Sequence, residues 1–115
     1  MKRLGEIYSC VILKGEHDTV VAKEARIEVK DPGCRKRCGG IGDILAGVLG
    51  SFVHSLATLS DVNIAELACK LVRRSCELGD QEKGYGLVAN DVLEFIPQSL
   101  MEMVECKVGR PLLMK

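Results

Sequence analysis

A glycine-rich stretch from Lys36 to Gly47 holds the residues of this chain that are best suited to chemistry. Three glycines within four positions lead into Asp43, and an apolar helical pattern follows at once. Glycines allow close backbone approach, so several N–H groups can point at one spot. A helix that begins there adds unpaired N–H groups and the positive end of its dipole. Such a loop predicts an anion site, most simply for a phosphate.

Asp43 stands at the rim of this predicted site. A negatively charged carboxylate repels a phosphate, so it is poorly suited to a site that only binds one. It does suit a base that takes the proton from a hydroxyl attacking phosphorus. The alternative is an ordinary tight loop in which Asp43 merely begins a helix. The loop by itself does not decide between the two, because short glycine motifs also occur by chance.

A second stretch lies upstream, and the two stretches together resemble one family. The run Arg37-Cys38-Gly39-Gly40-Ile41-Gly42-Asp43 resembles the G-x-G-D signature of ribokinase-like enzymes. More narrowly, it resembles the eukaryotic ATP-dependent NAD(P)H-hydrate dehydratases. Upstream, Lys14-Gly15-Glu16-x-Asp18 matches the nucleotide loop of the same family. The resemblance is close from Ile12 to Leu56 and loose over the remainder.

The resemblance implies a hydro-lyase that repairs hydrated NADH and NADPH. Such enzymes use ATP, with Mg²⁺, to phosphorylate the hydroxyl of the damaged ring, and phosphate then leaves and restores the double bond. Asp43 would be the catalytic base and would contact this substrate. The backbone N–H groups of Gly40, Ile41 and Gly42 would hold the transferred phosphoryl group. The ATP-binding residues that the resemblance implies are Lys14, Gly15, Glu16, His17, Asp18, Arg37, Cys38, Gly39, Gly40, Ile41 and Gly42.

The family's N-terminal portion has no counterpart in this chain. We therefore expect residues 1–115 to form a partial ribokinase-like domain without its N-terminal half. One alternative is a ribokinase-like kinase for a small molecule, which would keep its phosphorylated product. Another is an inactive fragment whose open sheet edge associates with a second copy or with the full-length protein. A late stretch, Lys83-Gly84-x-Gly86 with Asn90-Asp91, resembles a further family segment and predicts a wall of the nucleotide pocket.

Composition and charge narrow the expected partners. The chain has 115 residues, enough for one small domain, and its 16 basic and 16 acidic residues cancel. With aromatic residues at 3%, neither nucleic acid nor an anionic membrane is an expected partner. No apolar run suits a membrane span or a secretory signal. The six cysteines lack the spacing of a zinc site, and no protein metal ligands are predicted. Reduced thiols favour a cytoplasmic protein, with a mitochondrial location for longer forms.

Strands and a helix must position the two motifs. Ile7–Leu13 is an apolar stretch rich in β-branched residues, which is typical of a buried strand. Thr19–Ala22 and Ala25–Val29 predict a hairpin. From Asp43 to Leu56 a wide apolar stripe predicts a helix buried on most sides, whose glycines let another backbone pack close.

The helices that follow complete the predicted order. Ser60-Asp61 begins a helix over Val62–Leu78, and Gly79 ends it. Its solvent-exposed face is predicted to carry Glu66, Lys70, Arg73, Arg74 and Glu77.

After a loop over Gln81–Leu87, another helix begins at Asn90-Asp91, and Pro97 either kinks it or starts a further helix. Strands, glycine loop and helices in this order predict the closing part of a layered α/β domain, with a nucleotide where the loop meets the helix. The resemblance identifies this fold with the C-terminal part of a ribokinase-like domain.

Overall fold

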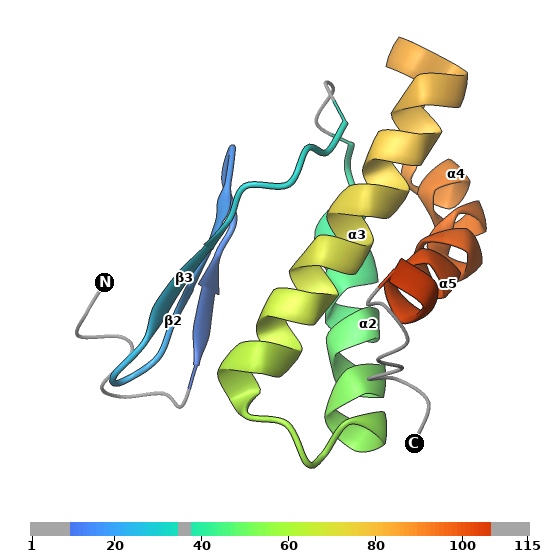
Figure 1. The fold of residues 1–115 in the computed structure, drawn as a ribbon. Coiled ribbons are helices and arrows are strands. Elements are labelled where there is room, and N and C mark those ends of the chain that lie inside the picture. The colour runs from blue at the N-terminus through green and yellow to red at the C-terminus, as the bar shows by residue number, and fades with distance from the viewer. Residues whose placement is uncertain (1–9, 35–37, 107–115) are drawn as a thin grey trace.

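A three-stranded antiparallel sheet opens the described part of the chain, which comprises residues 10–34 and 38–106 of the computed structural model (Figure 1). Its strands are β1 (Val11–Leu13), β2 (Asp18–Val21) and β3 (Arg26–Val29), in that spatial order. The predicted hairpin is confirmed, because β2 pairs with β3 with Val20 opposite Ile27. β-Branched side chains pack well on a pleated surface, and here Val20 and Val29 are buried in the same hydrophobic core as residues of the helices. The fold is α/β, as predicted.

β1 is an edge strand, which corrects the prediction of a buried strand over Ile7–Leu13. Among the described residues it pairs with β2 alone, with Val11 opposite Val21. Val11 and Ile12 are half-buried, and the Leu13 side chain is exposed. Residues 7–9 of the predicted strand lie outside the described residues. The apolar run predicted a strand correctly, but burial depends on how many strands and helices flank it.

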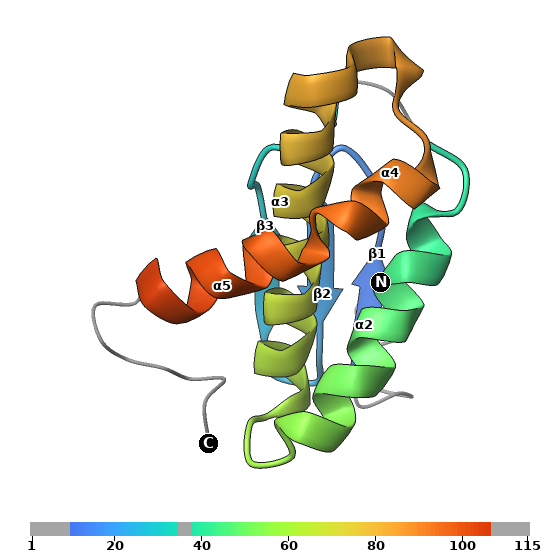
Figure 2. The ribbon, with the colours of Figure 1, turned by 90° about the vertical axis from the view of Figure 1, so that its right-hand side faces the viewer.

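The long helix α3 (Asp61–Lys83) is the element on which the others pack. The sheet lies on one side of it, α4 and α5 lie on the other, and α2 runs alongside (Figures 1 and 2). Ser60 caps the helix as predicted, since its Oγ accepts a hydrogen bond from the Asn63 N–H at 3.2 Å. The side chains that α3 buries include those of Ile64, Ala65, Ala68, Cys69, Leu71, Val72, Ser75 and Cys76.

The C-terminal end of α3 differs from the prediction. The helix does not end at Gly79 but continues to Lys83, and Gly84 follows it with a φ of 58°. The last residues of α3 and a short 3₁₀ turn, η1 (Gly84–Gly86), together replace most of the loop predicted over Gln81–Leu87. Gly79 serves packing instead, because a Cβ there would lie 2.7 Å from Cδ1 of the buried Leu87. A glycine in a helix therefore marked close packing here and not a helix end.

Two helices, α4 (Ala89–Glu94) and α5 (Ile96–Cys106), complete the described part of the chain. Pro97 lies in the first turn of α5, where no backbone N–H is needed, so the second of its two predicted roles is confirmed. Arg74 of α3 holds α5 by donating to the Glu102 carboxylate at 2.7 and 3.3 Å. None of the described helices is long and apolar enough to cross a membrane.

α2 (Ile41–Ser55) is less buried than its apolar stripe predicts. Within the helix only Leu45 and Phe52 are buried, and Val53 is 57% exposed. A Cβ at Gly47 or Gly50 would meet no described atom within 4 Å. The close packing expected at these glycines is therefore not found among the described residues, and one face of α2 is open.

Alanine at Gly47 is expected to raise the free energy of unfolding by about 1 kcal/mol, because alanine favours the helix and the added methyl group meets open space. Gly79→Ala is the matched control, since the same gain in helix propensity is opposed there by contact with Leu87. Urea unfolding of the parent and both variants measures the two effects. A Gly47→Ala protein less stable than its parent would contradict the open face of α2.

Candidate functional site

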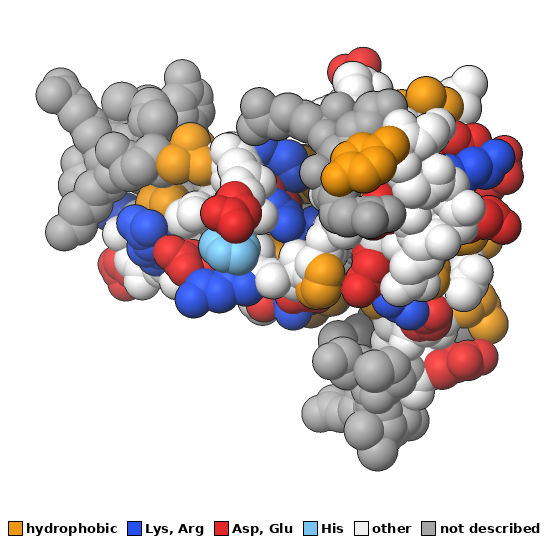
Figure 3. Space-filling model, turned by 90° about the horizontal axis from the view of Figure 1, so that it is seen from above, with side chains coloured by type: hydrophobic (Ala, Val, Ile, Leu, Met, Phe, Trp, Pro, Cys, Tyr) orange, Lys and Arg blue, Asp and Glu red, His pale blue; other side chains and the backbone are white. Residues whose placement is uncertain are grey.

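A cavity of about 760 Å³ opens where β1 turns into β2. It lies between this turn, the first turn of α2 and the middle of α3, at the end of the fold that is uppermost in Figure 1. Seen from above, Lys and Arg side chains show in the hollow between the strands and the helices (Figure 3). A cavity of this size suits a small organic ligand, and its cations suit an anionic one.

The cavity brings the two sequence motifs together. Residues 14–17, in the β1–β2 turn, line one side. Cys38, Ile41 and Gly42 line another, together with Gly33 and Cys34 from the segment before the glycine loop. Three of the predicted ATP-binding residues do not line the cavity, namely Asp18, Gly39 and Gly40. Arg37 lies outside the described residues. One ligand in this cavity could therefore contact both motifs, which are separate in sequence.

Gly40 sets the shape of the glycine loop. It precedes α2 with a φ of 98°, in the left-handed region that favours glycine. Its carbonyl accepts hydrogen bonds from the N–H groups of Asp43 at 3.1 Å and Ile44 at 3.2 Å. The N–H groups of Ile41 and Gly42 belong to the two residues before Asp43, at the start of α2. Unpaired N–H donors and the positive end of the helix dipole favour an anion at such a position.

The segment after α3 supports the glycine loop from behind. The Cys38 thiol donates a hydrogen bond to the Leu87 carbonyl at 3.3 Å. A Cβ on Gly40 would lie only 3.1 Å from the Cβ of Ala89. None of residues 83–91 lines this cavity, and a nucleotide-pocket wall in this stretch stays a prediction. Asp91 instead accepts a hydrogen bond from the Val88 N–H at 3.0 Å and so stabilises the start of α4.

Asp43, the predicted base, lies in the first turn of α2 and is exposed. It directly follows Gly42, which lines the cavity. A carboxylate in the first turn of a helix is favoured by the positive end of the dipole. The Asp43 side chain is thus accessible from solvent beside the cavity, although Asp43 does not itself line it.

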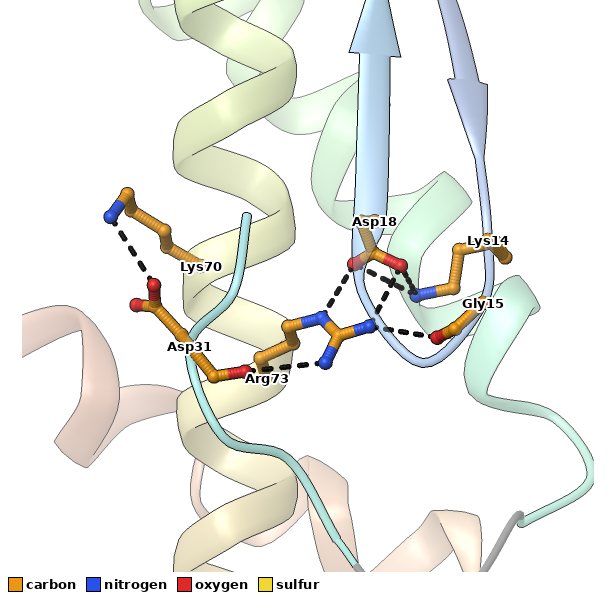
Figure 4. A network of polar contacts seen from close by, with 6 residues as sticks. All are labelled: Lys14, Gly15, Asp18, Asp31, Lys70 and Arg73. Carbon is orange, nitrogen blue, oxygen red and sulfur yellow. Dashed lines mark hydrogen bonds and ion pairs between the residues drawn. The ribbon is translucent and has the colours of Figure 1, made fainter. Parts of the chain in front are cut away.

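A buried ion-pair network stands behind the β1–β2 turn (Figure 4). Asp18 is fully buried, and Arg73 donates to its two oxygens from Nε at 2.8 Å and from Nη2 at 3.0 Å. Lys14 Nζ lies 3.0 Å from Oδ1 of the same carboxylate. Arg73 also donates to the carbonyl oxygen of Gly15 at 2.9 Å and to that of Asp31 at 3.2 Å. The network therefore joins α3 to both segments that border the cavity.

Burial and charge act in opposite directions on Asp18. Burial by itself raises the pKa of the carboxyl group. Hydrogen bonds from Arg73 and Lys14, and their positive charges, outweigh burial and hold this pKa below its usual range. The hydrogen bond to Asp18 likewise raises the pKa of Arg73. Both groups are charged at neutral pH, and the Asp18 carboxylate is satisfied by protein groups.

Arg73 is the site residue that the sequence interpretation misplaced. It was predicted on the solvent face of its helix, but its side chain is 11% exposed and lines the cavity. Val72 and Cys76 of the same helix also line the cavity. Burial, followed by the neighbouring Cys34, raises the pKa of the Cys76 thiol to about 12, so this thiol stays protonated at neutral pH. A polar residue on a helix carries no sign in the sequence that a distant hairpin will cover it.

Known proteins match most of this chain. The sequence family described as NAD(P)H-hydrate dehydratase matches residues 2–98. An ATP-dependent (S)-NAD(P)H-hydrate dehydratase from Entamoeba histolytica is 33% identical over 93 residues, which cover 76% of this chain and 31% of the relative. An ADP-dependent (S)-NAD(P)H-hydrate dehydratase from Natrialba magadii is 33% identical over 95 residues, which cover 83% of this chain and 36% of the relative. An ATP-dependent (S)-NAD(P)H-hydrate dehydratase from Bos taurus is 28% identical over 104 residues, which cover 83% of this chain and 32% of the relative. The chain thus spans about a third of the length of these relatives.

Asp18→Asn is expected to lower the free energy of unfolding at pH 7 by about 2–3 kcal/mol, because it leaves Arg73 without its buried counter-charge. The folded-state pKa of Asp18 is lowered, so its contribution is complete above the unfolded-state value of about 3.9 and is lost as the pH falls through the folded-state value. The difference between parent and variant should therefore shrink on acidification below about pH 4.5.

Urea unfolding at a series of pH values measures this difference. Asp31→Asn is the control, because its half-exposed pair with Lys70 at 3.4 Å should contribute less than about 1 kcal/mol. A difference between parent and Asp18→Asn that stays constant down to pH 3 would contradict the assigned charge on Asp18.

Proposed function

The chain belongs to the NAD(P)H-hydrate dehydratase family, and we propose that its cavity is the nucleotide side of a site that dehydrates hydrated NADH and NADPH with ATP. The observation that carries this proposal is the meeting of the Lys14–His17 turn with the first turn of α2 at one cavity. The complete reaction is proposed for the whole site, of which this chain supplies the residues described above.

The phosphates of ATP would lie between these two turns. Lys14 supplies a cation whose side chain is 40% exposed, and the N–H groups of Ile41 and Gly42 supply donors at the start of a helix. The absence of a side chain at Gly40 keeps the loop in the shape that presents these donors. Magnesium belongs to the proposal because phosphoryl transfer generally uses it, held largely by phosphates and water.

Asp43 is the proposed base. Its carboxylate accepts the proton of the ring hydroxyl of hydrated NADH or NADPH while the hydroxyl oxygen bonds to the γ-phosphorus of ATP and ADP leaves. The N–H groups of Ile41 and Gly42 stabilise negative charge on the transferred phosphoryl group. Departure of phosphate from the ring, with loss of a proton from the neighbouring carbon, then restores the double bond.

ATP is proposed over ADP because of the glycine loop. Relatives of both kinds match the chain, since the Natrialba magadii protein is named ADP-dependent and the Entamoeba histolytica protein ATP-dependent. The run from Arg37 to Asp43 resembles the eukaryotic ATP-dependent enzymes. A titration with both nucleotides decides the preference.

Calorimetric titration of residues 1–115 with Mg·ATP tests the nucleotide side. We expect saturable binding that Lys14→Ala weakens by about tenfold or more, because a charge-assisted contact to phosphate is lost. Gly40→Val should abolish binding, since it strains a left-handed residue and presses on Ala89. Lys23→Ala, an exposed lysine in the β2–β3 turn, is the matched control and should bind as the parent does. Equal loss in Lys23→Ala and Lys14→Ala would overturn the placement of the phosphates.

Recovery of NADH from hydrated NADH, in the presence of Mg·ATP, tests the chemistry. Asp43→Asn should lower kcat by a factor of about 10²–10⁴ while Mg·ATP binding is retained, because only proton transfer is removed. The assay is made on residues 1–115 and on the full-length Bos taurus relative carrying the matching substitution. A stable phosphorylated product without recovered NADH would indicate a small-molecule kinase instead.

A further inference from the structure

We propose that Arg73 is the positioning residue of the nucleotide site: it fixes the β1–β2 turn and the segment before the glycine loop at one separation, so that Lys14 and the first turn of α2 act on the same phosphates. This inference rests on the proposed function and assigns a role to a residue outside both sequence motifs. Arg73 acts through the groups that it holds and need not touch the nucleotide itself.

The geometry of one guanidinium group carries the proposal. Its four hydrogen bonds reach the Asp18 carboxylate twice, the Gly15 carbonyl oxygen and the Asp31 carbonyl oxygen (Figure 4). Gly15 lies in the turn that lines one side of the cavity, and Asp31 lies in the segment that leads to the glycine loop. The planar fork of donors fixes both distance and direction at each partner.

α3 gives Arg73 a fixed origin. The neighbouring Val72 and Ser75 are fully buried, and the helix contacts the sheet, α2 and α5. A side chain that starts from a packed helix and is 11% exposed has little freedom to move. The β1–β2 turn is exposed at each of residues 14–17, whereas Asp31, Gly33 and Cys34 of the other segment are half-buried, so Arg73 supplies order to the turn that its own packing does not.

Lys14 and Arg73 share the Asp18 carboxylate, and each of the two cations has a different task. Lys14 is the outer one, with a side chain 40% exposed, and Arg73 is the inner one. If Lys14 turns from Asp18 to a phosphate, Arg73 still neutralises the buried carboxylate, which would otherwise be left as an unpaired buried charge. Arg73 thus leaves Lys14 available for the ligand while Asp18 stays buried.

Arg73→Lys tests the role, because lysine keeps the charge and most of the stem but cannot form the fork. Arg74→Lys is the matched control: the adjacent residue of α3 also makes a forked ion pair, but it faces Glu102 of α5 and does not line the cavity. We expect Arg73→Lys to weaken Mg·ATP binding by about tenfold or more, and Arg74→Lys to leave it within about twofold.

A double-mutant cycle separates positioning from simple loss of charge. In the parent, Lys14→Ala should weaken Mg·ATP binding by about tenfold or more, whereas in the Arg73→Lys background it should weaken binding less than about threefold. Additive losses would overturn the proposal, as would parent-like affinity in Arg73→Lys or an equal loss in Arg74→Lys.

A readout without nucleotide keeps this test independent of the proposed function. The {¹H}–¹⁵N nuclear Overhauser effects of Glu16 and His17 should fall in Arg73→Lys and stay at parent values in Arg74→Lys. If the parent fails to bind Mg·ATP while these values change as expected, the proposed function fails and the ordering role of Arg73 stands. Unchanged values in Arg73→Lys overturn that role. The Gly47→Ala background, which is expected to be more stable, serves for these comparisons if Arg73→Lys does not fold alone.

Discussion

The buried carboxylate of Asp18 is the constraint from which the geometry of the cavity follows. A charged group with no exposure must be matched by hydrogen-bonded cations, because leaving it unpaired in the interior is far more costly than any single surface contact is favourable. Its two cations come from different elements, Lys14 from the end of β1 and Arg73 from the middle of α3. Satisfying one charge therefore aligns the hairpin with the helix.

Two adjacent arginines give α3 two different connections. Arg73 reaches toward the sheet and the segment before the glycine loop, whereas Arg74 reaches the other way and pairs with Glu77 and Glu102. The first pair is buried and governs the shape of a cavity. The second is half-exposed and holds α5 against the helix, so water and salt screen it more strongly. Neighbours in sequence thus have separate tasks because a helix turns them to different faces.

Features set by local sequence could be predicted, and features set by distant contacts could not. The hairpin, the Ser60 cap and the place of Pro97 in the first turn of a further helix, one of its two predicted roles, follow from a few adjacent residues each, and the structure confirms them. The predicted end of α3 was wrong because Gly79 does not end the helix. It is glycine at a place where the helix packs closely against Leu87. Burial of α2 was overestimated because an apolar stripe does not show whether a neighbour covers it.

The candidate site shows the same division. The two motifs were recognisable from residue types and order, and both border one cavity. Their nucleotide role remains a proposal. Nothing in the sequence marked Arg73 as a residue of the site, because its partners Asp18, Gly15 and Asp31 lie far from it in the sequence. Asp18 was placed among the nucleotide residues, whereas the structure surrounds its carboxylate with protein groups.

The contact between Gly40 and Ala89 links the glycine loop to a helix that borders no part of the cavity. Any side chain at position 40 would press on the Cβ of Ala89 and would also strain the left-handed backbone there. The start of α4 therefore restricts the evolution of the loop at this point. Among descendants of this chain, position 40 should stay glycine, although the residue that helps to restrict it is separated from it by the whole of α2 and α3.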